Sequence, residues 1–189
     1  MPKCVLILSG KRKSGKDFLK DELKRLLKDN CCVLTLSAPL KKQYALEHDL
    51  DFNRLLDSSD YKELHREEMI KWGEEKRSKQ PSFFCELSAK DAETKNQNND
   101  SVIWIVSDAR RPTDIEYFIT KYGREKIKLI RVTASEAVRT SRGFVFKHGI
   151  DDADSECALD ELIDWDLEFE NNDEDEFRSC MIKLLALLP

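Results

Sequence analysis

Residues 4–17 read CVLILSGKRKSGKD, an apolar run that leads directly into a loop of glycines and basic residues. A continuous apolar run of this length is typical of a strand that is buried on both faces. After the loop, apolar side chains recur at helical spacing, at Phe18, Leu19, Leu23, Leu26 and Leu27. The stretch therefore predicts a strand, a loop and a helix, in that order.

The loop at 10–17 carries the pattern G-x-x-x-x-G-K through Gly10, Gly15 and Lys16. Between a buried strand and a helix, this pattern predicts a phosphate-binding loop. Glycines allow the backbone N–H groups to converge on an anion, and the N-terminus of the following helix adds a partial positive charge. Lys16 is then expected to reach the β- and γ-phosphates of a nucleotide. The alternative, a basic turn, explains neither the two glycines nor the flanking elements.

Length and composition indicate one domain spanning 1–189, because 189 residues with 40% hydrophobic and 37% charged side chains can bury a core. A net charge of −5 spread along the chain argues against a nucleic-acid surface and against a polybasic membrane anchor. The six cysteines form no C-x-x-C pair and follow no signal peptide, so we expect reduced thiols in a cytosolic protein. The longest apolar run is too short to cross a bilayer, so no membrane association is expected.

Four more apolar runs follow the first, and helical-looking sequence separates each from the next. The runs are CCVLTLS at 31–37, VIWIVS at 102–107, IKLIRVT at 127–133 and WDLEF at 165–169. The clearest helical stretches span 59–79, 112–122 and 173–188. Buried strands that alternate with helices predict an α/β domain with a five-stranded parallel sheet.

Two longer segments interrupt this alternation. The segment between the second and third runs is largely helical and too long for one crossover, so it predicts a helical lobe at about 38–95. The later part of KDAETKNQNNDS, at 90–101, predicts an exposed loop. After the fourth run, SEAVRTSRGFVF at 135–146 places Arg139 and Arg142 three residues apart on a short helix. These arginines belong either to a lid at about 135–152 or to the ordinary surface.

Two aspartates are candidate Mg²⁺ ligands. Asp17 stands where a phosphate loop usually has a Ser or Thr whose hydroxyl contacts the metal. A carboxylate also suits a hard cation, and an acid at a helix N-terminus complements the helix dipole as well. Asp108 follows the run at 102–107 and is either a Walker B acid that holds water on the metal or a helix cap. The three histidines are isolated and predict no metal site.

Polar residues follow the third and fifth runs, at the sheet edge where the phosphate loop also opens. Arg110 and Arg111 are adjacent, and neighbouring guanidiniums favour an anion between them, such as an acceptor phosphate. Asn171 and Asn172 come directly after the last run and form either a turn or an amide pair that binds an adenine edge. The chemistry alone favours the turn.

Five motifs together resemble the animal-type phosphomevalonate kinase family over nearly the whole chain. They are GKRKSGKDF, LSAPLKKQYA, YKELHREEMIKWGEEKR, SDARR and RGFVF. The resemblance implies a P-loop fold like that of nucleoside monophosphate kinases, with three layers, a helical acceptor lobe and a lid. It also implies ATP- and Mg²⁺-dependent conversion of (R)-5-phosphomevalonate into 5-diphosphomevalonate and ADP. This reaction belongs to the mevalonate pathway of isoprenoid and sterol biosynthesis, including that of cholesterol.

The resemblance also implies roles for individual residues. Catalytic roles fall on Lys16, Arg110 and Arg142. ATP contacts fall on Lys11, Arg12, Lys13, Ser14, Gly15, Lys16, Asp17, Arg139, Arg142 and Asn172. Acceptor contacts fall on Lys41, Lys62, Arg77, Arg110, Arg111 and Asn171. Asp17 and Asp108 remain the candidate metal ligands.

Two rival functions differ from this one in the acceptor. A nucleoside monophosphate kinase or dephospho-coenzyme A kinase on the same fold would offer an aromatic or amide pocket for a base. A nucleotide-binding regulatory module would need no acceptor cations. The many lysines and arginines favour a small, doubly anionic acceptor. We expect a monomer that binds these small molecules and no nucleic acid. A cytosolic location is expected, since the chain ends in Leu-Leu-Pro and not in a peroxisomal tripeptide.

Overall fold

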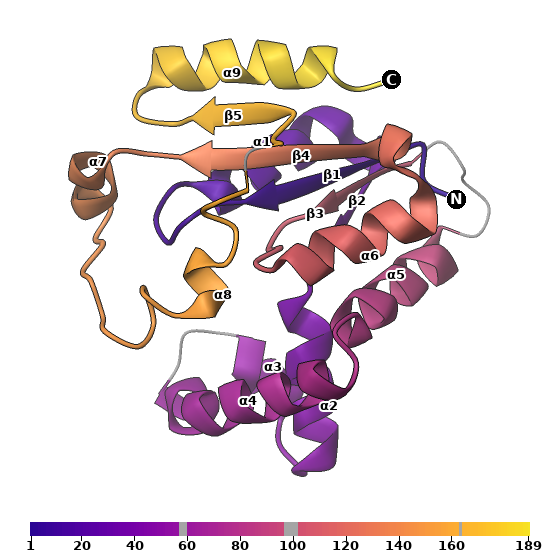
Figure 1. The fold of residues 1–189 in the computed structure, drawn as a ribbon, viewed down its shortest axis with the longest axis vertical. Helices are drawn as coiled ribbons and strands as arrows, with labels where there is room; N and C mark the ends of the chain where they lie inside the picture. Colours follow the sequence, from indigo (N-terminus) through magenta and orange to yellow (C-terminus); the bar gives the residue numbers. More distant parts are fainter. Residues whose placement is uncertain (57–59, 97–101, 163) are drawn as a thin grey trace.

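A computed structural model describes residues 1–56, 60–96, 102–162 and 164–189. Its sheet has five parallel strands in the order β2-β3-β1-β4-β5 (Figure 1). The strands are β1 (Cys4–Ser9), β2 (Cys31–Leu34), β3 (Ile103–Val106), β4 (Ile127–Thr133) and β5 (Leu167–Glu170). The predicted five-stranded parallel sheet is confirmed. The second strand is shorter than its apolar run, because Ser37 already belongs to the next helix.

Helices lie between the strands along the chain and after β5. They are α1 (Lys16–Leu27), α2 (Ser37–Glu47), α3 (Phe52–Leu56), α4 (Asp60–Lys79), α5 (Phe83–Lys95), α6 (Pro112–Tyr122), α7 (Glu136–Ser141), α8 (Asp154–Cys157) and α9 (Glu174–Ala186). Two short 3-10 helices are η1 (Lys28–Asn30) and η2 (Arg124–Lys126). The helix α5 extends into the polar stretch at 90–101, whose last residues, 97–101, lie outside the described part.

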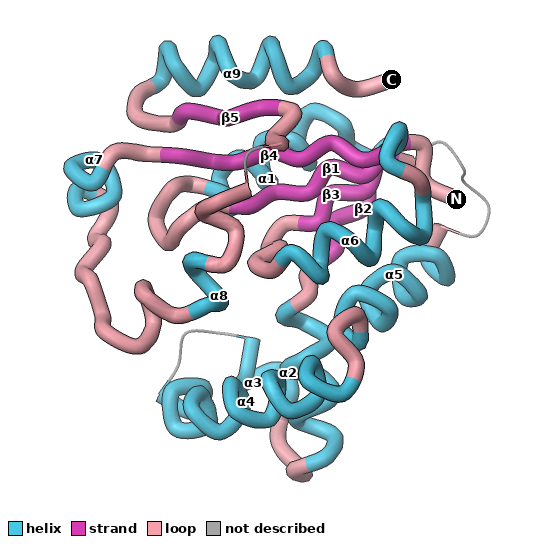
Figure 2. Tube along the Cα trace, viewed as in Figure 1, coloured by secondary structure: helices cyan, strands magenta, loops and turns pink. Residues whose placement is uncertain are grey.

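The sheet is covered on both faces, which gives the predicted three layers (Figure 2). Because side chains alternate along a strand, β1 sends Val5 and Ile7 into one core and Leu6 and Leu8 into the other. Helices α5 and α6 complete the first core, and helices α1 and α9 complete the second. All four side chains of β1 are 0% exposed. Each therefore contributes about 1.5–3 kcal/mol of hydrophobic stabilisation.

The helices α2, α3 and α4 lie beyond one edge of this sandwich and share a small core of their own (Figure 1). Tyr44, Ala45, Leu55 and Met69 form its buried centre. The helix α5 belongs to the main body, because its buried side chains Cys85, Ala89 and Ala92 pack in the core of the sheet. In the described residues, no helix is long and apolar enough to span a bilayer.

Candidate active site

The loop between β1 and α1 is tightly fitted between its neighbours. Gly10 and Gly15 have φ angles of 152° and 99°, in the region that favours glycine. A Cβ atom on Gly10 would collide with the carbonyl oxygen of Val132 on β4, and one on Gly15 with the amide of Asn171. The two glycines therefore serve both the curl of the loop and its close approach to β4 and to the end of β5.

Lys16 opens α1, and its ammonium group folds back over the loop. It donates to the carbonyl oxygen of Gly10 and, at 3.3 Å, to that of Lys11. Burial, followed by the nearby charge of Arg110, lowers the pKa of Lys16 to about 8. A polyanion beside this ammonium would favour its charged form. A bound phosphate would therefore raise the pKa of Lys16 and pair with its charge.

A cavity of about 620 Å³ opens beside the loop. Eight of its fourteen lining residues are lysine or arginine, namely Lys11, Arg12, Lys13, Lys16, Lys20, Lys41, Arg110 and Arg142. Asp17 and Asp108 are the carboxylates among the rest. Such an excess of positive charge in a concave site is suited to polyphosphate and phosphomonoester ligands.

The segment after β4 contacts the loop through the two predicted lid arginines. Arg139, in the last turn of α7, donates from Nε to the carbonyl oxygen of Arg12 at 2.8 Å. Arg142, directly after α7, donates to the carbonyl oxygen of Ser14 at 3.1 Å and to that of Asn171 at 2.7 Å. The structure thus brings both arginines to the phosphate loop.

The two asparagines after β5 support this arrangement. Asn171 is 5% exposed and donates from Nδ2 to the carbonyl oxygen of Ser14 at 2.9 Å. Asn172 accepts from the backbone N–H of Ser135 at 2.7 Å and donates to Glu176 at 2.8 Å. Both side chains are engaged with the protein, one beneath the loop and the other at the start of α7. Their predicted substrate and nucleotide contacts stay predictions.

The two candidate metal ligands differ in their surroundings. Asp108 accepts from the backbone N–H groups of Leu36 and Ser37 at 2.6 and 3.0 Å, so it caps the N-terminus of α2. Asp17 has a side chain that is 92% exposed and that pairs with Lys20 at 3.4 Å. The described residues contain no cluster of three or more His, Cys, Asp or Glu side chains around one point. Two carboxylates in one cavity still fit Mg²⁺, which commonly binds one or two carboxylates together with substrate phosphates.

Comparison with known proteins assigns the chain to a family. The family model for phosphomevalonate kinase matches residues 8–124. A phosphomevalonate kinase from Drosophila melanogaster is 37% identical over 171 residues, which cover 90% of this chain and 89% of that protein. The chain belongs to the phosphomevalonate kinase family. Membership in this family makes it a kinase and confirms the resemblance that the five motifs indicated.

Solved structures show the same fold as this member of the phosphomevalonate kinase family. The crystal structure of TT1252 from Thermus thermophilus aligns with a TM-score of 0.55 over 100% of both chains at 15% identity. A gluconokinase from Sinorhizobium meliloti 1021 aligns with a TM-score of 0.51 at 12% identity, over 98% of this chain and 94% of its own. The arrangement is thus the α/β fold of P-loop kinases.

The predicted acceptor cations of this kinase divide into two groups. Arg110 and Lys41 line the cavity beside the loop. Arg77 instead pairs with Asp114 at 3.1 Å and lies over the ring of Phe84. Arg111 pairs with Glu74 at 2.5 Å, and neither Arg77 nor Arg111 is among the residues that line the cavity. Lys62 lies on α4, but its side chain is outside the described part of the structure.

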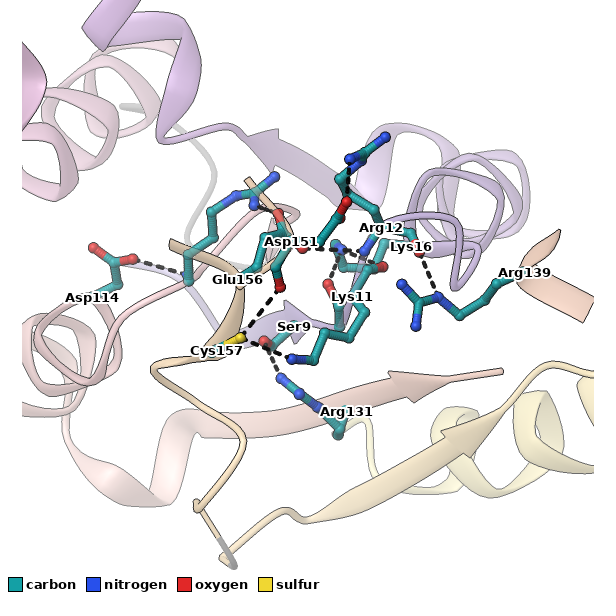
Figure 3. Close-up of polar contacts among 12 residues, drawn as sticks. Ser9, Lys11, Arg12, Lys16, Asp114, Arg131, Arg139, Asp151, Glu156 and Cys157 are labelled. Carbon is teal, nitrogen blue, oxygen red and sulfur yellow. Dashed lines mark hydrogen bonds and ion pairs between the residues drawn. The ribbon is translucent and has the colours of Figure 1, made fainter. Parts of the chain in front are cut away.

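The sequence did not identify three acids near the cavity as functional candidates. Asp151 pairs with Arg12, Glu156 pairs with Arg110, and Asp160 pairs with both Lys11 and Arg131. All three come from residues 151–160, which surround α8 and lie against the phosphate loop (Figure 3). The available signal for Asp151 and Glu156 was the acidic run DDADSEC at 151–157, separated by four residues from the basic lid motif that ends at Phe146. Arg131, on β4, gave no such signal, because it reads as part of an apolar strand.

Proposed function

We propose that this kinase transfers the γ-phosphoryl group of ATP to the phosphate of (R)-5-phosphomevalonate, forming 5-diphosphomevalonate and ADP. The observation that carries the proposal is the cation-lined cavity at the mouth of a phosphate loop, in a member of the phosphomevalonate kinase family. The reaction would place the protein in the mevalonate pathway of isoprenoid and sterol biosynthesis. A monomeric, cytosolic enzyme remains a prediction from the sequence.

The acceptor explains why the cavity has this character. A phosphomonoester has a second pKa near 6, so it is mostly a dianion at neutral pH and needs no general base. The main obstacle is then the repulsion between the acceptor and the triphosphate. Cations on both sides of the transferred group remove that obstacle, which fits an excess of lysine and arginine over carboxylates.

Roles follow from the position of each side chain. Lys16 and the loop N–H groups would hold the β- and γ-phosphates, and Arg139 and Arg142 would keep the lid segment against the loop. Arg110 and Lys41 would bind the acceptor phosphate. The predicted acceptor residues that lie away from the cavity, Arg77 and Arg111, would act by holding α4 against α6 and the end of β3. Lys62 is retained as a predicted acceptor contact.

Asp17 and Asp108 would hold Mg²⁺ beside the phosphates. The metal supplies positive charge that offsets the negative charge of the triphosphate. Because Asp108 already accepts two backbone N–H groups, Asp17 is the carboxylate that is more available to a metal or to its water ligands.

Asp17→Asn is expected to raise the Mg²⁺ concentration needed for half-maximal rate and to lower kcat. A carboxylate beside the triphosphate is tolerable chiefly because a cation lies between them. Without metal, ATP affinity should stay the same or rise, since the substitution removes a repulsive charge. Titration of Mg²⁺ at fixed ATP checks this, with Asp21→Asn on the same helix as a control. Superimposable metal curves for Asp17→Asn and wild type would leave Asp17 as a helix-end acid only.

The proposed function predicts strong discrimination between acceptors. With ATP, the protein should phosphorylate phosphomevalonate and reject mevalonate by a factor of about 10⁴ in kcat/KM, because the cations that line the cavity would lack their anion. One ADP-release assay with phosphomevalonate, mevalonate, AMP, CMP and dephospho-coenzyme A decides among the candidate acceptors. Equal turnover of phosphomevalonate and mevalonate would contradict the proposal, and preferred turnover of AMP or CMP would favour a nucleoside monophosphate kinase.

A further inference from the structure

The segment 151–160 places three carboxylates on cations of the active site. Figure 3 shows two of them, Asp151 and Glu156. Asp151 pairs with the guanidinium of Arg12 at 2.8 Å, and Asp160 pairs with Arg131 at 2.5 Å and also with Lys11. Glu156 is the acid that contacts both halves of the site. These pairs neutralise part of the positive charge that the cavity would otherwise carry.

The two carboxylate oxygens of Glu156 bind different parts of the site. Oε1 pairs with the guanidinium of Arg110, which follows β3 and lines the cavity. Oε2 accepts from the backbone N–H of Arg12, in the phosphate loop after β1, at 3.2 Å. One carboxylate therefore connects the proposed acceptor cation to the loop that would hold ATP.

The opposite end of Arg110 is also held. Its backbone N–H donates to Oδ2 of Asp114 at 3.0 Å, and Asp114 is itself 1% exposed. A long arginine side chain loses many rotamers when its guanidinium end is held. Glu156 holds that end of Arg110, and Asp114 holds the backbone end.

The burial of Glu156 shows whether its carboxylate positions Arg110 or only occupies the place of the acceptor phosphate. The side chain of Glu156 is 4% exposed, and moving this carboxylate aside would break its bond to the loop N–H. The side chain of Arg110 is 42% exposed, so pairing with Glu156 leaves part of the guanidinium facing the cavity. An acceptor phosphate can bind that part while Glu156 stays in place.

We propose that Glu156 is a positioning residue, which fixes the guanidinium of Arg110 at a set place relative to the phosphate loop. The inference rests on the proposed function, in which Arg110 binds the acceptor phosphate. The geometry matters because phosphoryl transfer requires the acceptor oxygen to lie in line with the γ-phosphate. Glu156 itself touches neither substrate in this proposal.

The test combines kinetics with a spectroscopic signal from Arg110. Glu156→Gln should lower kcat about 10- to 100-fold, because it removes the charge that pairs with Arg110. The KM for ATP should stay within about twofold, because the amide oxygen of glutamine can still accept from the backbone N–H of Arg12. Glu156→Asp keeps the charge and should recover part of the loss. In ¹⁵N-arginine NMR spectra without substrates, the signal of the Arg110 side chain is the one that disappears in Arg110→Lys. This signal should show hindered rotation of the guanidinium group in wild type, and Glu156→Gln should abolish the hindrance. The exposed Glu161→Gln is the matched control and should change neither readout.

A double-mutant cycle shows whether Glu156 acts through Arg110. In an Arg110→Lys background, Glu156→Gln should have less than a third of the effect on kcat that it has in wild type. The proposal would be overturned by additive effects in the cycle or by an unchanged kcat in Glu156→Gln. A lower KM for the acceptor in Glu156→Gln would also overturn it, by showing that Glu156 competes with the acceptor. If wild type fails to phosphorylate phosphomevalonate, the proposed function fails, and the NMR result alone decides whether Glu156 holds Arg110. Circular dichroism and thermal unfolding verify that each variant is folded.

Discussion

Lys16→Met is expected to lower kcat by about 10³-fold or more while the fold stays intact. The ammonium group sits over the phosphate loop, where negative charge on the transferring phosphoryl group redistributes, and interactions that strengthen there contribute most to kcat. Methionine keeps an unbranched side chain, one atom shorter than that of lysine, and removes the charge. Steady-state kinetics with saturating ATP and phosphomevalonate measure the loss.

The stability of this variant should not fall with its activity. Because burial lowers the pKa of Lys16 to about 8, well below its unfolded value, the charged form destabilises the fold at neutral pH. That penalty is fully present below pH 8 and disappears as the pH rises toward the unfolded pKa. Removing the charge relieves that penalty but also removes the two hydrogen bonds to the loop carbonyls, so the Tm at pH 7 should stay close to that of wild type. The matched control is Lys24→Met, on the exposed part of α1. A near-native kcat in Lys16→Met would show that Lys16 has no part in the mechanism.

Gly10→Ala is expected to weaken ATP binding by about 100-fold or more. The new Cβ would meet the backbone oxygen of Val132, which belongs to a central strand and cannot rotate away as a side chain would. The φ angle of 152° adds strain of about 1–3 kcal/mol for any residue with a Cβ. The loop must then shift away from β4, and its N–H groups lose their common focus. Calorimetric titration with ATP measures the affinity, and thermal unfolding measures the cost to the fold.

Gly149→Ala is a control that separates the backbone strain of a positive φ angle from the collision of a new Cβ atom with its neighbours. Gly149 also has a positive φ, 77°, but a Cβ atom there would meet no described atom within 4 Å. This variant should bind ATP as wild type does, with only a small loss of stability. If Gly10→Ala binds ATP as tightly as Gly149→Ala, the close approach of the loop to β4 does not matter for nucleotide binding.

Local pattern was sufficient for the fold and for the loop between β1 and α1. Apolar runs bounded by polar sequence predicted all five strands. The signal was clearest for β1 and β3, because a strand buried along its whole length must be apolar along its whole length. The spacing of Gly10, Gly15 and Lys16 predicted the phosphate loop, because the conformation of such a loop is decided within eight residues. The ends of elements were predicted less accurately, since capping and packing decide them. Within the run at 31–37, for example, β2 ends at Leu34 and α2 begins at Ser37.

Patterns within the chain were thus enough to place the sheet, the layers and the phosphate loop, but they did not reveal the partner of each charged side chain. Arg77 and Asp114 are 37 residues apart, and Glu156 meets the N–H of Arg12 across 144 residues. A long cationic side chain can reach in many directions, and its choice depends on which acid the packing of distant elements brings near. Backbone conformation follows from neighbours in the chain, but the pairing of charges follows from neighbours in space.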